Sequence, residues 1–162
     1  MKKNKISKNW LINQKRDLFF RQSKIEGYRS RAAYKLIEMN KKFKFLKKSS
    51  FVLDLGSCPG GWSQVVKKEV IEGKILAVDA KFMEKINKVD FIKGDFRENK
   101  IYEKIMVYFN NKADVVLSDM AANTSGNKTY DSYRTGDLCL NAMSLATKIL
   151  VKDGVFLSKL FM

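Results

Sequence analysis

Residues 52–64, which read VLDLGSCPGGWSQ, join an apolar strand to a helix through a glycine-rich loop, and they decide the predicted fold. Gly56, Gly60 and Gly61 let the backbone turn sharply and approach a ligand closely, and the start of the following helix leaves N–H groups unpaired. In open α/β sheets, ligands bind in the crevice at the carboxyl ends of such strands. The glycines are not spaced as G-x-G-x-x-G, so the loop disfavours a nicotinamide-dependent dehydrogenase.

Short apolar runs alternate with helical patterns on the C-terminal side of this loop. The expected strands are 51–55, 74–79, 89–95, 113–119 and 154–161, and the expected helices are 61–71, 97–110 and 136–151. Strands that alternate with helices imply right-handed crossovers and a mostly parallel sheet covered on both faces. The predicted fold class is therefore α/β, Rossmann-like and doubly wound.

Acidic residues end three of the predicted strands. Asp79 ends the second strand, where its carboxylate can accept hydrogen bonds from both ribose hydroxyls of a nucleoside, and Asp95 ends the third, where it could meet an adenine amino group. Asp119 ends the fourth strand. One such acid alone is more often a helix cap or a surface turn. Three acids at successive strand ends meet in one crevice, so together they predict a nucleoside-binding site.

The first 50 residues differ from the rest in charge. The chain of 162 residues carries a formal net charge of +15, and its basic residues are dense and interleaved with aromatic residues before Phe51. Lysines that replace the counterions of phosphates favour RNA as a partner, although an AT-rich genome also enriches lysine. We predict a basic helical extension at 1–50 that contacts RNA, with one helix up to about Arg29 and another capped by Ser30, followed by a core at 51–162.

Other features argue against export, membranes and metals. No apolar run approaches the roughly 20 residues that span a bilayer, and the basic N-terminus lacks the apolar region and cleavage site of a secretory signal. Cys58 and Cys139 are far apart and have no C-x-x-C partner, which disfavours a disulfide framework and a structural zinc site. We expect a cytoplasmic protein with no membrane partner and no bound metal.

Five motifs resemble in order those of the FtsJ-type (RrmJ) heat-shock ribosomal RNA methyltransferases, and the resemblance covers the chain from near Trp10 to its end. They are RSRAAYKL at 29–36, DLGSCPGGWSQ at 54–64, GDFR at 94–97, LSDMAANTSG at 117–126 and FLSKLF at 156–161. The resemblance implies an S-adenosylmethionine-dependent methyltransferase core at 51–162. It also implies methylation of the ribose 2′-oxygen of a uridine in large-subunit (23S-type) ribosomal RNA, within a ribosomal particle.

The same resemblance implies roles for single residues. Those expected in the S-adenosylmethionine pocket are Gly60, Trp62, Asp79, Asp95 and Asp119, beside Gly56 and Gly61 of the loop. Lys35, Asp119 and Lys159 match three members of the family's Lys-Asp-Lys-Glu catalytic set. The fourth member, a glutamate in a later strand, has no counterpart, and the family's final helix and two edge strands are missing. We therefore expect slow turnover, and a monomer whose exposed apolar edge at 154–162 is prone to pair with another chain.

Ribose methylation explains why these residue types are needed. A ribose hydroxyl is a poor nucleophile, so the enzyme must align oxygen, methyl and sulfur and remove the hydroxyl proton. Lys159 could accept that proton if its pKa fell well below ~10.4. Lys35 as a neighbouring cation would lower this pKa, whereas the charge of Asp119 would oppose the change. The alternative function is a catalytically impaired RNA- or ribosome-binding protein that retains the cofactor fold.

Overall fold

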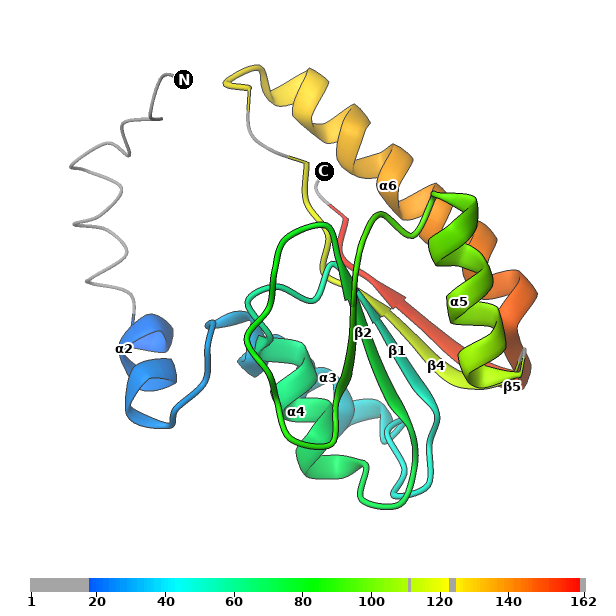
Figure 1. Ribbon diagram of the computed structural model, residues 1–162. Helices are drawn as coiled ribbons and strands as arrows, with labels where there is room; N and C mark the ends of the chain where they lie inside the picture. The colour runs from blue at the N-terminus through cyan, green and yellow to red at the C-terminus, as the bar shows by residue number, and fades with distance from the viewer. Residues whose placement is uncertain (1–17, 111, 123–124, 161–162) are drawn as a thin grey trace.

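The computed structural model describes residues 18–110, 112–122 and 125–160 of the chain (Figure 1). The strands are β1 (Val52–Leu55), β2 (Ile75–Asp79), β3 (Asp90–Lys93), β4 (Ala113–Ser118) and β5 (Leu150–Ser158). The helices are α2 (Leu18–Ile25), α3 (Ala32–Phe43), α4 (Gly61–Glu69), α5 (Asn99–Phe109) and α6 (Lys128–Ile149). Trp10 and the rest of the first expected helix before residue 18 lie outside the described residues, as does Phe161.

The strands form one parallel sheet in the order β3-β2-β1-β4-β5. From β1 the chain first adds β2 and β3 on one side, and then returns to add β4 and β5 on the other. The order thus reverses between β1 and β4, and this reversal opens a crevice at the carboxyl ends of the strands where ligands bind in such folds. The prediction of a mostly parallel, doubly wound α/β fold is confirmed.

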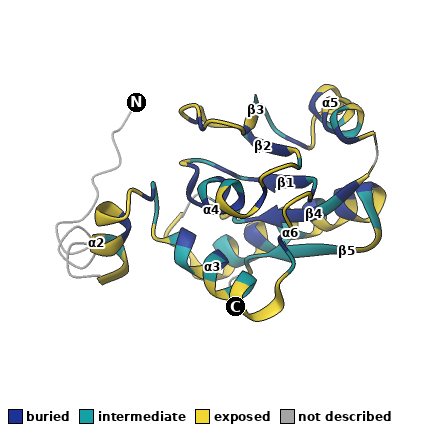
Figure 2. Cartoon of the chain, turned by 90° about the horizontal axis from the view of Figure 1, so that it is seen from below, coloured by how far each residue is buried: buried dark blue, intermediate teal, exposed yellow. Residues whose placement is uncertain are grey.

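Helices cover both faces of the sheet, because neighbouring residues of a buried strand point to opposite sides. Val52 belongs to the hydrophobic cluster that includes Leu36 of α3 and Val66 of α4. The next residue, Leu53, belongs to a second cluster with residues of α5 and α6, among them Ile105. Figure 2 shows the buried central strands between these helices. All four residues of β1 are buried, which explains why three of them are apolar, and Asp54 is the one exception.

The prediction that Ser30 caps helix α3 is wrong. Helix α3 begins at Ala32, and its N-cap residue is Arg31 in a helical conformation with no side-chain cap hydrogen bond. The hydroxyl of Ser30 instead lies where a Cβ atom on Gly61 would sit. Ser30 therefore serves packing against the start of α4 and does not cap its own helix.

Helix α6 and strand β5 both begin earlier than the sequence predicted. Helix α6 starts at Lys128 because Asn127 caps it, with the side-chain oxygen of Asn127 accepting a hydrogen bond of 3.2 Å from the backbone N–H of Tyr130. Strand β5 starts at Leu150, directly after this helix. These shifts lengthen both elements and leave their order in the fold unchanged.

Strand β5 lies at one edge of the sheet. It pairs with β4 on one side, and the described residues place no strand on its other side. The expected edge position is confirmed, whereas the pairing of this edge with another chain stays a prediction. Across residues 18–110, 112–122 and 125–160, no helix combines the length and the apolar character needed to cross a bilayer.

Candidate active site

A cavity of about 510 Å³ lies at the carboxyl ends of the central strands. Its volume falls in the range of small-molecule sites, roughly 300–1,000 Å³. Four residues that the sequence predicted for the cofactor line it: Gly56, Asp79, Asp95 and Asp119. The cavity therefore brings the three strand-end carboxylates together, as their positions in the sequence indicated.

Two glycines of the loop are needed for the close approach of its backbone. Gly56 has a φ of +71°, and a Cβ atom there would collide with the side chain of Met120. Gly60 has a φ of +112° and precedes α4, where a Cβ atom would lie 2.8 Å from Cδ1 of Ile86. Both backbone conformations strain any other residue. Gly56 lines the large cavity, whereas Gly60 lies outside its lining and lets the loop backbone approach Ile86.

The carboxylate of Asp79 holds the loop in place. One of its oxygens accepts a hydrogen bond of 2.8 Å from the backbone N–H of Cys58, and the other accepts one of 2.7 Å from the N–H of Lys81. Each carboxylate oxygen has two lone pairs, so both keep capacity for a further donor. Asp79 can thus fix the loop and still accept hydrogen bonds from the two hydroxyls of a ribose.

Asp95 is paired with Arg97 in a fork. The Arg97 Nε–H lies 3.0 and 3.1 Å from the two carboxylate oxygens, and the terminal nitrogen donates at 2.6 Å. These hydrogen bonds hold the pKa of Asp95 below its usual value, because they favour the charged form. The carboxylate that was expected to meet an adenine amino group therefore shares its oxygens with a guanidinium.

Asp119 and Lys159 form an ion pair at the cavity. The Lys159 Nζ lies 2.7 Å from Oδ1 of Asp119, and each side chain is 21% exposed. The same nitrogen donates to the backbone carbonyl of Asp119 at 3.2 Å. Strand pairing explains the contact. Ser118 of β4 is paired with Ser158 of β5, and Asp119 and Lys159 are the residues that follow them in the sequence. The structure thus brings together two of the three expected catalytic residues.

The third expected catalytic residue, Lys35, comes from a different element. It is an exposed residue of α3. Within the described residues, no hydrogen bond or ion pair connects it to Asp119 or Lys159, whose side-chain contact to each other is direct. A role for Lys35 in catalysis stays a prediction from the family motif.

A second, much smaller pocket of about 10 Å³ adjoins the first and shares Gly56 and Asp119 with it. Gly61 and Trp62, two of the residues expected at the cofactor, line this pocket and not the large cavity. Trp62 is only 4% exposed, and its indole N–H donates to the backbone carbonyl of Ala32 at 2.9 Å. Its ring therefore also anchors the start of α3 on the core.

Asp54 is a residue of this small pocket that the sequence analysis did not select. It is fully buried, and its Oδ2 accepts a hydrogen bond of 2.6 Å from the Ser63 hydroxyl. Its Oδ1 has no hydrogen-bond partner among the described residues. Burial raises the pKa of Asp54 to about 7, and the charges of Asp119 and Asp79 add to the increase. The sequence signal was present: one acid within an otherwise apolar, buried strand.

The N-terminal part of α6 also contributes to the large cavity, and the sequence analysis missed it. Tyr133, Arg134, Asp137 and Leu138 of this helix line the cavity. Tyr133 and Arg134 precede Gly136, where the predicted helix began. Because no helix was predicted before Gly136, these two side chains were not expected at the site.

Comparisons with known proteins agree with this geometry. The sequence model of the FtsJ-like methyltransferase family matches residues 28–162. The chain is similar to ribosomal RNA large subunit methyltransferase E of Pelagibacter ubique, with 50% identity over 162 residues, 100% of this chain and 80% of the relative. The protein of the same name from Acinetobacter baylyi is 42% identical, with 99% of this chain and 75% of the relative covered.

A solved structure supports the same relationship. It is a crystal structure from Plasmodium falciparum described as that of a ribosomal RNA methyltransferase, with a TM-score of 0.77 and 34% identity. The alignment covers 83% of this chain and 79% of the other. Motifs, fold and site geometry therefore lead to one assignment: the chain belongs to the FtsJ-like methyltransferase family of enzymes.

Proposed function

We propose that the chain transfers the methyl group of S-adenosylmethionine to the ribose 2′-oxygen of a uridine in large-subunit ribosomal RNA. The observation that carries this proposal is the ion pair of 2.7 Å between Lys159 and Asp119, a residue that lines a nucleoside-sized cavity. The names of the relatives support ribosomal RNA as the substrate class. We further propose that the enzyme is cytoplasmic and monomeric and acts on a ribosomal particle.

The residues of the cavity fit S-adenosylmethionine. Asp79 has lone pairs free for ribose hydroxyls, Asp95 can accept from an adenine amino group, and the loop from Gly56 to Trp62 presents backbone N–H groups at the start of a helix. When bound, the cofactor supplies a methyl group that its sulfonium activates. The chain's own residues must then hold the acceptor hydroxyl and take up its proton.

We assign the uptake of that proton to Lys159, which would act in its neutral form. Its Nζ is held by two oxygens of Asp119, the carboxylate at 2.7 Å and the backbone carbonyl at 3.2 Å. These contacts hold the amine against Asp119, and Asp119 itself lines the cavity. With the cofactor bound, Nζ would accept the proton of the 2′-hydroxyl while that oxygen takes the methyl group, and the bond between the methyl carbon and the sulfur would break to leave S-adenosylhomocysteine. Lys35, from the same family motif set, would add a positive charge near the acceptor.

Basic residues of the extension would hold the RNA. Lys41, Lys42 and Lys44 are exposed at and just beyond the end of α3, next to the exposed ring of Phe43. Exposed cations and aromatic rings suit phosphates and unstacked bases. We keep residues 1–50 as the proposed RNA-contacting region, although Leu36 of this region also packs into the hydrophobic core.

Calorimetric titration with S-adenosylmethionine tests the cofactor part of the proposal. We expect binding to the chain, and at least tenfold weaker binding to Asp79→Ala, because that variant loses both the ribose acceptor and the anchor of the loop. Glu72→Ala, at an exposed acid remote from the cavity, is the matched control and should bind like the unaltered chain. Tight binding of NAD without binding of S-adenosylmethionine would disprove the cofactor assignment.

A further inference from the structure

The side chain of Arg29 joins two loops that border the cofactor cavity. One terminal nitrogen donates to the backbone carbonyl of Glu84 at 2.7 Å and to that of Pro59 at 3.2 Å. The other terminal nitrogen donates to the carbonyl of Lys85 at 3.1 Å. Pro59 belongs to the glycine-rich loop after β1, whereas Glu84 and Lys85 belong to the loop after β2. The guanidinium therefore connects segments that are distant in sequence.

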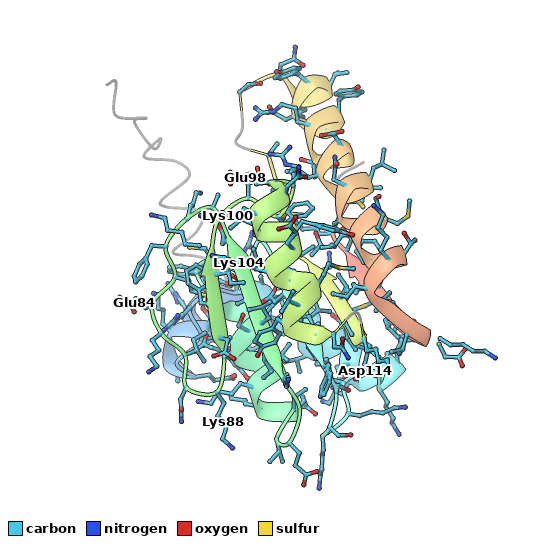
Figure 3. The ribbon with its side chains drawn as sticks, turned by 45° about the vertical axis from the view of Figure 1, so that its right-hand side comes forward. Glu84, Lys88, Glu98, Lys100, Lys104 and Asp114 are labelled. Carbon is cyan, nitrogen blue, oxygen red and sulfur yellow. The ribbon has the colours of Figure 1, made fainter. Side chains whose placement is uncertain are left out.

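The guanidinium of Arg29 is held mainly by its hydrogen bonds to backbone carbonyls, and its attraction to the carboxylate of Glu84 adds little stability. The Glu84 carboxylate lies 3.9 Å from Arg29 and is 85% exposed, so solvent screens the attraction. Figure 3 shows Glu84 at the outer edge of the molecule. A guanidinium suits three carbonyls because its five N–H donors have a fixed, planar arrangement, which the single ammonium of lysine cannot reproduce.

Both loops are walls of the cofactor cavity. Cys58 of the first loop, and Ala80 and Lys81 of the second, line it. The guanidinium approaches the first loop so closely that a Cβ atom on Gly60 would lie 3.1 Å from its terminal nitrogen. The distance between these two walls therefore depends on the position of Arg29.

The backbone around Arg29 is fixed from the other side by α4. The N–H of Arg29 donates to the Gln64 side-chain oxygen at 2.7 Å, and the Gln64 side-chain nitrogen donates to the carbonyl of Gly27 at 2.9 Å. Residues 27–31 also connect α2 to α3, the two described helices of the basic extension (Figure 1). A displacement of α2 or α3 would therefore also move Arg29, which contacts both loops that line the cavity.

We propose that Arg29 is a positioning residue that couples RNA binding on the extension to cofactor binding in the cavity. The inference rests on the proposed role of the extension in RNA binding. RNA that holds α2 and α3 in one pose fixes residues 27–31, and Arg29 then holds the two loops in the pose that accepts the cofactor. The coupling is reciprocal, so the cofactor strengthens RNA binding by the same factor.

Lys68 provides a matched control. Its ammonium donates to the hydroxyl of Tyr28 at 2.7 Å, so it also joins the 27–31 segment to α4. It is exposed and does not border either pocket. Lys68→Ala therefore weakens the attachment of the extension without releasing the two loops, which separates a general loss of docking from the specific action of Arg29.

The test is calorimetric titration with S-adenosylhomocysteine, with and without saturating transcribed large-subunit ribosomal RNA. We expect RNA to tighten binding about fivefold or more in the unaltered chain. Arg29→Ala should reduce this factor to below about twofold at saturating RNA. Arg29→Lys keeps the charge but not the planar donors, so it should also lose most of the coupling, whereas Lys68→Ala should keep it.

Several outcomes would overturn the inference. These are no coupling in the unaltered chain, full coupling in Arg29→Ala or Arg29→Lys, and equal loss of coupling in Lys68→Ala. If Arg29→Ala does not fold, as judged by its thermal unfolding, Arg29→Lys decides the result. A chain that binds neither RNA nor S-adenosylhomocysteine would refute the proposed function, and this outcome differs from intact binding of both without coupling.

Discussion

The proposed catalysis depends at the residue scale on one contact, the ion pair between Asp119 and Lys159. The pair forms because β4 and β5 run parallel with Ser118 opposite Ser158, so the residues that follow these two lie side by side. Asp119 also borders both pockets, so the same carboxylate faces the proposed cofactor site and the lysine to which we assign the uptake of the proton. A change at Asp119 should therefore affect chemistry more than folding.

Asp119→Asn should lower the rate of methyl transfer about 100-fold or more, because the lysine amine loses the anion that orients it. Single-turnover transfer at saturating cofactor measures the chemical step. Lys152→Ala, which removes an exposed lysine from the same strand β5, is the matched control and should leave the rate unchanged. A similar rate in Asp119→Asn and the unaltered chain would contradict the role of the pair.

The buried carboxylate of Asp54 predicts how stability changes with pH. Its pKa is about 7 in the folded chain, above its ordinary value of 3.8, so the folded state binds the proton more tightly than the unfolded state. The free energy of unfolding should therefore fall as pH rises from about 4 to about 7, and the full cost of the charge should remain at higher pH.

Asp54→Asn removes this cost and keeps an acceptor for the Ser63 hydroxyl. We expect it to raise the free energy of unfolding at pH 8 by about 1 to 4 kcal/mol, and by much less at pH 4. Urea denaturation at both pH values measures the difference, with Glu72→Gln as an exposed control. An equal effect of Asp54→Asn at the two pH values would show that the carboxylate does not titrate in this range.

At the scale of elements, the sequence predicted strands and core helices well and helix starts poorly. Buried strands such as β1 and β4 produce unbroken apolar runs, which locate them directly. The N-terminal part of α6 gives no such signal, because Tyr130 and Tyr133 are exposed there and no apolar period forms. The cap at Asn127 was the remaining clue, and polar residues around it resembled a loop.

In the candidate site, too, some features could be predicted from the sequence and others could not. Carboxylates at strand ends could be predicted, because topology places them at one edge of the sheet whatever the loops do. The pairing of Asp95 with Arg97 and that of Asp119 with Lys159 depend on side-chain directions that spacing does not determine. Asp54 was missed because an acid inside a strand was not examined for burial.

The basic surface of α3 predicts how RNA binding responds to salt. Lys41→Ala, Lys42→Ala and Lys44→Ala combined in one chain should reduce the slope of log affinity against log salt by up to about 2, since each neutralised phosphate of single-stranded RNA contributes about 0.7. Filter binding over a range of salt concentrations measures the slope. A triple substitution of Lys100, Lys104 and Lys112, exposed residues elsewhere, is the control; equal slopes in both variants would mean that α3 is not the RNA surface.

At the scale of the whole molecule, two surfaces must work on one substrate. The net charge of +15 supports attraction to RNA in general, whereas in our proposal the cavity binds the cofactor and the Asp119–Lys159 pair acts on a hydroxyl acceptor. An RNA- or ribosome-binding protein without catalysis would need the first property alone. The two functions therefore separate in an assay that detects methyl transfer.

The central claim is that this chain methylates a ribose hydroxyl, and transfer of a tritiated methyl group tests it most directly. Large-subunit ribosomal RNA should be labelled, an all-DNA copy of the same sequence should not be labelled because it lacks the 2′-hydroxyl, and Lys159→Ala should label neither. Binding of cofactor and RNA without any labelling would favour the non-catalytic alternative. Equal labelling of RNA and DNA, or undiminished labelling by Lys159→Ala, would contradict the account.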